Sequence, residues 1–360
     1  MKSLNIMFAL ASLVTSFSAH ALDIGGIKLS GEVSFDYNNL SSGDNYYPAN
    51  GGAGNDQYRL YQGQLVAAKE TDEFSFLARF NYQPLEVTTT GTTTTKQNFG
   101  TLEQLEIYYK IRPEFIVGFG RLCSTMGYES LNRSENTFYT NTVTYQSLVP
   151  GYGEGVRLRY NPGDYLSLTL SSYNRSTYNL YGDDYTPTKT TEFSATGAWN
   201  SLTWFGGYYF GTDRDSATPT QQVEKKAGNA WVSYKFTEAF VAAVTFDSRA
   251  QKPNGGSEIS AQSITAQLSY TWLKHTFGLR YESLAGADNL DALNSVTGVF
   301  YSGGDKLQVW TIGDRIQIAD NLHLHLEYRQ DVMDTDIFKD KDGGDTDHLH
   351  MFTVGAVAYF

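Results

Sequence analysis

The 360-residue sequence contains one cysteine, Cys123, and only eight prolines. Past residue 21 it has no uncharged apolar run of about 18 residues, which disfavours a membrane-spanning helix. A single cysteine excludes an internal disulfide framework. We expect Cys123 to be buried and inert, with an intermolecular bridge or a reactive thiol as the alternatives. The net charge of −12 argues against nucleic acid as a partner, because its phosphates would be repelled.

The first 21 residues have the pattern of a secretory signal peptide. Lys2 supplies a basic start, Leu4 to Phe17 is mostly apolar, and Ala19-His20-Ala21 is a cleavage site of the A-x-A form. The apolar stretch is too short and too interrupted to span a membrane as a helix. We therefore expect residues 22–360 to leave the cytoplasm, with a length that suits two ordinary domains or one large barrel.

The composition favours strands, since 26 tyrosines, 21 phenylalanines and 5 tryptophans accompany 34 glycines. The last stretch, 352–360, alternates strictly, with an apolar row that starts at Phe352 and ends at Phe360. Such a terminal strand must be paired on both edges and covered by something apolar. A closed transmembrane barrel meets both conditions. The alternative is an edge strand of a soluble β-sandwich.

Similar alternation recurs along the chain and predicts sixteen antiparallel strands in eight hairpins, with fourteen or eighteen as alternatives. Short turns alternate with long polar loops, as in an outer-membrane barrel whose turns face the periplasm and whose loops face outside. A β-propeller would show a comparable spacing but no apolar outer band. Two strands fit poorly, Tyr58 to Ala68 and Lys306 to Ile318, and each would need a β-bulge.

The rows opposite the apolar faces carry most of the charge, and sixteen strands enclose a water-filled lumen. A basic residue facing lipid at mid-depth would cost about 2 to 4 kcal/mol, so we expect these residues to face inward. The inward charged residues are Lys28, Glu32, Asp36, Arg79, Lys110, Arg112, Arg157, Arg159, Asp247, Arg249, Arg280, Glu282, His323, His325, Glu327, Arg329 and Asp331.

Residues 121–151 interrupt the rhythm and are too many for a simple connection. We expect this loop to fold into the lumen, where Glu129 and Glu135 could face Arg157 and Arg159 and set up a transverse field. The alternative is an external loop. The predicted pore-lining and constriction residues are Arg79, Lys110, Arg112, Arg121, Glu129, Glu135, Arg157, Arg159, Arg280, Glu282, His323, His325, Glu327 and Arg329.

The same region resembles the OmpL-like β-barrel porin family. The matching residues are Gly118-Phe119-Gly120-Arg121, Gly127-Tyr128-Glu129, Glu135-Asn136 with Phe138-Tyr139, Pro150, and Gly155-Val156-Arg157-Leu158-Arg159-Tyr160. The resemblance implies a barrel porin that passes small hydrophilic solutes. One departure is Ser124-Thr125, where a Thr-Pro pair would be expected before Gly127, and it leaves the entry of the loop less fixed.

Other motifs are weaker. Asp340, Asp342, Asp345 and Asp347 break the spacing of a calcium loop, and we interpret them as a solvated acidic loop. His323 and His325 could bind a metal with Glu327, but the simpler interpretation is that they line the water-filled lumen.

The sequence thus predicts an outer-membrane porin for passive diffusion of small hydrophilic solutes or ions, without catalytic residues or cofactors. Its expected partners are outer-membrane lipid and lipopolysaccharide, with a homo-oligomer left open. The alternatives are a barrel-based hydrolase, for which Asp347 and His348 lie at the height of the outer rim, and a plugged structural or adhesin barrel.

Overall fold

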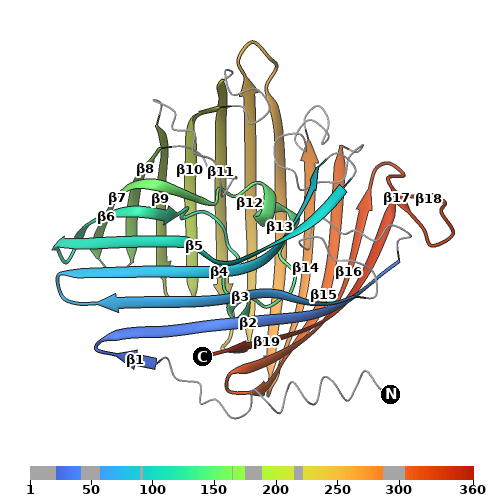
Figure 1. The fold of residues 1–360 in the computed structure, drawn as a ribbon, viewed down its shortest axis with the longest axis horizontal. Helices are drawn as coiled ribbons and strands as arrows, with labels where there is room; N and C mark the ends of the chain where they lie inside the picture. The colour runs from blue at the N-terminus through green and yellow to red at the C-terminus, as the bar shows by residue number, and fades with distance from the viewer. Residues whose placement is uncertain are drawn as a thin grey trace.

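The computed structural model describes residues 22–41, 57–89, 92–163, 165–174, 189–214, 222–286 and 305–360, so the expected signal peptide lies outside the described residues. Within these ranges, sixteen long strands form one closed antiparallel barrel (Figure 1). The strands are β2 (Ile27–Leu40), β3 (Gln57–Glu70), β4 (Phe74–Thr89), β5 (Thr92–Arg112), β6 (Phe115–Cys123), β7 (Tyr152–Gly163), β8 (Leu166–Tyr173), β9 (Thr190–Trp199), β10 (Leu202–Arg214), β11 (Gln222–Lys235), β12 (Phe240–Pro253), β13 (Ile259–Trp272), β14 (His275–Gly286), β15 (Lys306–Ala319), β16 (Leu322–Met333) and β19 (His348–Tyr359).

The barrel closes at the terminal strand, as its sequence predicts. In β19, Ala356 lies opposite Leu324 of β16 on one side and opposite Phe35 of β2 on the other. Phe352 and Phe360 are 44% and 43% exposed on the outer face, whereas Thr353 and Val357 of the opposite row are fully buried. Both edges of this strand are therefore paired, and no free sheet edge remains there.

Short turns connect the two strands of each hairpin. Asn200 and Ser201 join β9 to β10, and Leu273 and Lys274 join β13 to β14. Asn200 and Leu273 have φ values of 53° and 55°, the left-handed backbone that two-residue hairpin turns use. Both turns lie where the sequence predicts them.

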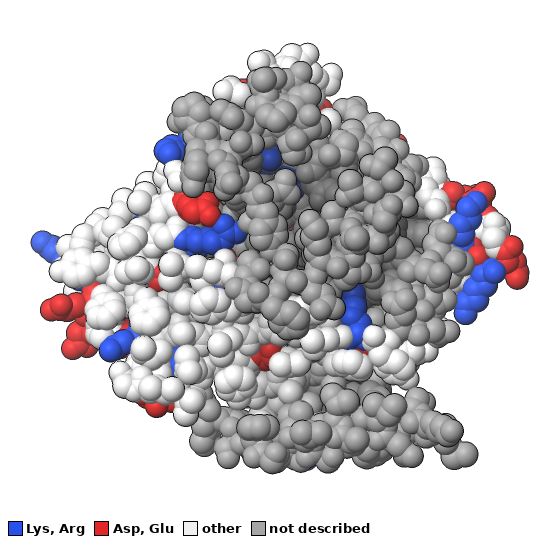
Figure 2. All heavy atoms as spheres, in the orientation of Figure 1, with Lys and Arg blue, Asp and Glu red and all other residues white. Residues whose placement is uncertain are grey.

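The outer face is apolar. Along β12 to β15 its exposed residues include Val244, Ile264, Phe277 and Ile312. Figure 2 shows charged side chains gathered at two opposite edges of the molecule, with a few more on the described surface between them. Exposed apolar rows are the surface that a bilayer requires.

The two irregular strands differ in how they are accommodated. In β3, the register passes from Gln62 to Leu60, which leaves Tyr61 as a bulge, as predicted. In β15, the bulge falls at Ile318, beyond Asp314, so it does not change the face on which the Asp314 side chain lies. Asp314 therefore stays on the outer row, where its carboxylate lies 2.8 Å from His275 Nδ1 near the turn.

The remaining elements are small. β1 (Leu22–Ile24) pairs with β2, and β17 (Phe338–Lys339) pairs with β18 (Asp345–Thr346) in the connection before β19. Between β6 and β7 lie the 3₁₀ turn η2 (Arg133–Glu135) and the short helix α2 (Val143–Ser147). No helix in the described part of the chain is long and apolar enough to cross a membrane.

Candidate functional site

The connection between β6 and β7 is attached to the inner wall of the barrel. We call residues 124–151 the inner segment. Ser124 N donates to Gly151 O at 2.7 Å, so the two ends of the segment meet beside the wall that they leave. In between, its side chains and backbone form hydrogen bonds with inward-facing residues of β2, β3, β4, β9, β11, β12, β13, β14, β15 and β16.

Wall glutamates hold the segment by its backbone. Three of them, each at most 3% exposed, accept two consecutive backbone N–H groups. The pairs are Glu32 with Arg133 and Ser134 (2.7 and 3.2 Å), Glu282 with Val143 and Thr144 (3.1 and 2.7 Å), and Glu327 with Tyr139 and Thr140 (2.9 and 3.2 Å). Charge-assisted bonds of this kind are about twice as strong as neutral ones, so buried carboxylates here fix the path of the segment.

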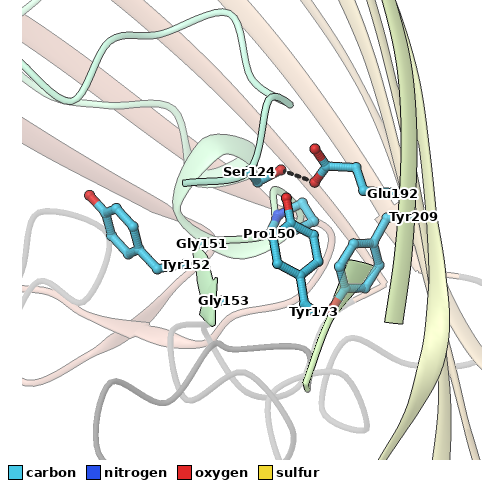
Figure 3. Close-up of a pocket in the computed structure, with 8 residues that line it drawn as sticks. All are labelled: Ser124, Pro150, Gly151, Tyr152, Gly153, Tyr173, Glu192 and Tyr209. Atoms are coloured by element: carbon cyan, nitrogen blue, oxygen red, sulfur yellow. Dashed lines mark hydrogen bonds between the residues drawn. The ribbon is translucent and has the colours of Figure 1, made fainter. Parts of the chain in front are cut away.

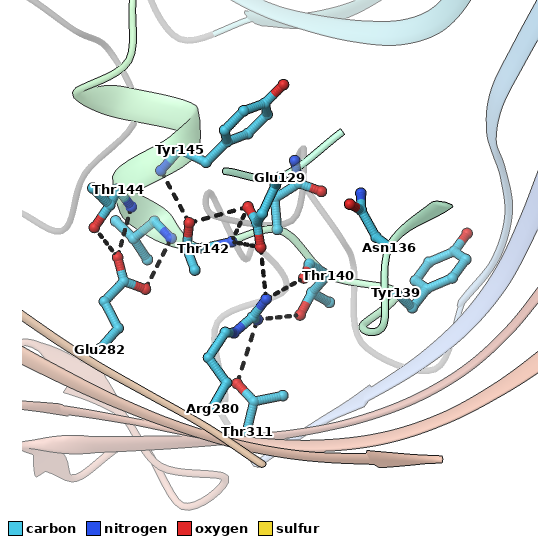
Figure 4. A network of polar contacts seen from close by, with 12 residues as sticks. Glu129, Asn136, Tyr139, Thr140, Thr142, Thr144, Tyr145, Arg280, Glu282 and Thr311 are labelled. Atoms are coloured by element: carbon cyan, nitrogen blue, oxygen red, sulfur yellow. Dashed lines mark hydrogen bonds and ion pairs between the residues drawn. The ribbon is translucent and has the colours of Figure 1, made fainter. Parts of the chain in front are cut away.

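Wall arginines hold the segment by its carbonyls. Arg280 donates to Thr140 O at 2.9 Å and forms an ion pair with Glu129 at 2.8 Å (Figure 4). Arg249 donates to Ser147 O at 2.6 Å, and Arg329 donates to Asn141 O at 3.1 Å. Wall carboxylates therefore bind amides of the segment and wall arginines bind its carbonyls, which accounts for part of the predicted inward charge.

The expected opposition of Glu129 and Glu135 to Arg157 and Arg159 is not the observed pairing. Glu129 pairs with Arg280, and exposed Glu135 accepts a bond from Asn132 Nδ2 at 2.7 Å. Arg157, only 3% exposed, donates to Tyr173 OH, Ser171 Oγ, Tyr108 OH and the carbonyl of Cys123. The length of the interruption indicates an inserted loop but not which wall residues it will use.

Three predicted residues lie at other places on the wall. Arg79 donates to Asn132 Oδ1 of the segment at 3.1 Å. Lys110 binds Glu70 at 2.9 Å near the β3–β4 turn, and Arg112 is exposed at the β5–β6 turn.

Arg121 differs from its predicted position. It lies opposite Leu105 and Glu154 in the row that also holds outward-facing Phe119, and it pairs with Glu154. Its register therefore belongs to the outer row rather than to the lumen.

The two wall histidines contact tyrosines. His323 Nε2 lies 3.2 Å from Tyr359 OH, and His325 meets the ring of Tyr139 edge-on. Neighbouring Glu327 is already bound to the segment.

Apolar inner surface was not predicted. One cluster joins Val143 and Leu148 of the segment to inward residues of six strands and to Phe338: Leu40, Ala261, Leu284, Leu307, Val309, Met333, Leu349 and Met351. A second joins Leu122, Met126 and Val149 to Tyr173, Phe205, Tyr209 and Ala227. Their signal in the sequence is that some inward positions far from the short turns are apolar, among them Leu284, Leu307 and Leu349.

Small cavities remain between segment and wall. One is lined by Ser124, Pro150, Tyr152, Tyr173, Glu192 and Tyr209, where Ser124 Oγ donates to Glu192 at 2.6 Å (Figure 3). Another separates Tyr128, Glu129 and Thr142 from Thr245, Asp247 and Thr265.

At the outer rim, His348 Nδ1 lies 2.8 Å from Asp347, with the two side chains 49% and 52% exposed. The hydrogen bond from His348 lowers the pKa of Asp347 below its ordinary value. Both groups form a solvated pair.

Comparisons with known proteins agree with this architecture. Residues 22–360 match the family model described as "Putative beta-barrel porin-2, OmpL-like". No curated protein matches the chain.

Several solved structures share the fold. The outer membrane channel DcaP of Acinetobacter baumannii is 13% identical, with a TM-score of 0.63 over 95% of this chain and 100% of that one. OmpT of Vibrio cholerae in its trimer form is 13% identical, with a TM-score of 0.61 over 94% and 100%. An anion-selective porin from Comamonas acidovorans is 10% identical, with a TM-score of 0.59 over 93% and 99%.

Proposed function

The chain belongs to the OmpL-like β-barrel porin family, and we propose from this premise that its lumen passes small hydrophilic solutes and ions by passive diffusion. The protein is an outer-membrane porin. Membership of the family does not specify how solutes pass the inner segment.

The observation that carries the proposal is the sorting of side chains around the closed ring. Outward rows are apolar, while inward rows near the short turns carry accessible hydroxyls, among them Thr196, Thr203 and Thr271. A polar, accessible inner wall is what water and hydrated solutes need. The inner segment then serves as the constriction, because it is hydrogen-bonded to inward-facing residues of ten strands.

We also propose that copies associate in the membrane, as the trimer form of the Vibrio cholerae protein suggests for this architecture. Outer-membrane lipid and lipopolysaccharide are the expected partners of the remaining apolar surface. Cross-linking of the protein in native outer membranes tests the association, and a single monomer band at all cross-linker concentrations would contradict it.

Bilayer recording tests the channel. Purified protein added to a planar bilayer should give stepwise, ohmic currents, and liposomes carrying it should swell in small sugars but not in large oligosaccharides. Membranes that stay silent, although the protein is folded and inserted, would instead support a plugged structural barrel. Turnover of a peptide or phospholipid with little current would support the hydrolase.

A further inference from the structure

Among the described side chains, Lys110 of β5 and Arg157 and Arg159 of β7 face inward, and they differ in what they bind. Lys110 is paired with Glu70 at 2.9 Å, and Arg157 is enclosed by hydrogen bonds, with Glu106 at 3.9 Å. Arg159 is partly exposed, and no carboxylate among the described residues pairs with it. In the sheet it lies opposite Ile116 of β6 and Thr169 of β8, neither of which carries charge.

An aromatic ring supports the Arg159 guanidinium. Its central carbon lies 5.4 Å from the centre of the Tyr108 ring, within the range of a cation–π contact. Tyr108 is itself held, because its hydroxyl donates to Glu106 Oε2 at 2.8 Å and accepts from Arg157 at 3.2 Å. Arg157 therefore fixes the position of Tyr108, and the Tyr108 ring orients the guanidinium of Arg159.

This arrangement suits an anion. A guanidinium supported on an aromatic ring keeps N–H donors available along its edge, and that edge matches the two oxygens of a carboxylate. The support also reduces the side-chain freedom that a solute would otherwise have to restrict on contact.

We propose that Arg159, supported by Tyr108, is the solute-contacting residue of the lumen and makes the channel favour small organic carboxylates over cations and neutral solutes of similar size. The proposal rests on the proposed function, since it assigns a solute class to the same channel. Arg157 is a positioning residue in this scheme, because it acts through Tyr108.

Reversal potentials in gradients of potassium chloride and potassium acetate test it. The unmodified channel should favour the anion, and Arg159→Gln should reduce the anion-to-cation permeability ratio by about fivefold while single-channel conductance stays measurable. Arg159→Lys keeps the charge but loses the planar fork, so the chloride ratio should persist while the acetate preference falls.

Two further variants separate the roles. Tyr108→Leu removes the ring, and it should lower the acetate preference without removing the charge. Lys226→Gln removes a cation on the outer row of β11 that is already paired with Glu258, so its permeability ratio should stay close to that of the unmodified channel. Open channels with an unchanged ratio in Arg159→Gln would overturn this inference alone, whereas absence of any conductance in the unmodified protein would overturn the channel itself.

Discussion

Gly355 on β19 shows how much a single missing side chain decides in this barrel. A Cβ atom built at this position would lie 2.4 Å from Cδ2 of Tyr139, so the glycine leaves the space in which that ring packs against the wall. Gly278 on β14 does the same for Phe138, at 2.7 Å. Glycine in a strand appears in the sequence as a weak position, and nothing in its spacing indicates which aromatic residue it receives.

Gly355→Ala should therefore destabilise the folded barrel. Overpacking at a seated ring costs about 1–3 kcal/mol, and the loss can be measured as a lower urea midpoint in detergent. Gly206→Ala on β10 is the matched control, because its added Cβ would meet nothing within 4 Å. Equal urea midpoints for the two variants would contradict the seating of Tyr139.

A second residue-scale prediction concerns the carboxylate of Glu282. Glu282→Gln replaces one acceptor oxygen with an N–H₂ group that faces the amide of either Val143 or Thr144, since each amide binds a different oxygen. Leaving buried donors unsatisfied costs about 1–3 kcal/mol, so the urea midpoint should fall and single-channel current should become noisier as α2 loosens. The same change at exposed Glu224 should leave both unchanged, and a quiet, fully stable Glu282→Gln channel would show that the segment does not depend on this contact.

At the scale of elements, the inner segment is the part whose presence could be predicted and whose attachment could not. Its length indicates more than a connection. Many of its anchors, however, are backbone amides and carbonyls, which almost every residue has, so no side-chain pattern within the segment identifies those contacts. Glu129 illustrates the difficulty, because its partner Arg280 lies 151 residues away along the chain.

Shortening the segment tests whether it limits permeation. Because Ser124 and Gly151 are hydrogen-bonded to each other, a short Gly-Ser linker can replace residues 126–149 without moving β6 or β7. Single-channel conductance should rise severalfold, and larger sugars should enter liposomes. Heat-modifiable migration on gels checks that the barrel still forms, and a folded variant with unchanged conductance would place the narrowest point elsewhere.

For the whole molecule, strand alternation predicts the closed ring well, because lipid and lumen impose opposite requirements on successive residues. Alternation predicts less well which partners individual side chains contact. Inward Leu284 and Leu307 are buried in an apolar cluster rather than in water, and Asp314 stays on the outer row beside His275. Both departures arise from tertiary partners that a period of two cannot represent.

The division between lipid and lumen can be tested by placing one charge on either side of the wall. Val244 on β12 is 47% exposed on the outer face, and Val244→Arg should cost about 2–4 kcal/mol, measured by folding into lipid vesicles at increasing urea concentrations. Ser269 lies on an inward row of neighbouring β13 and is partly buried, so Ser269→Arg should fold nearly as well as the unmodified chain while shifting its reversal potential toward anions. A larger loss of folding free energy for Ser269→Arg than for Val244→Arg would mean that the apolar rows do not face lipid. The assignment of the lumen would then be wrong.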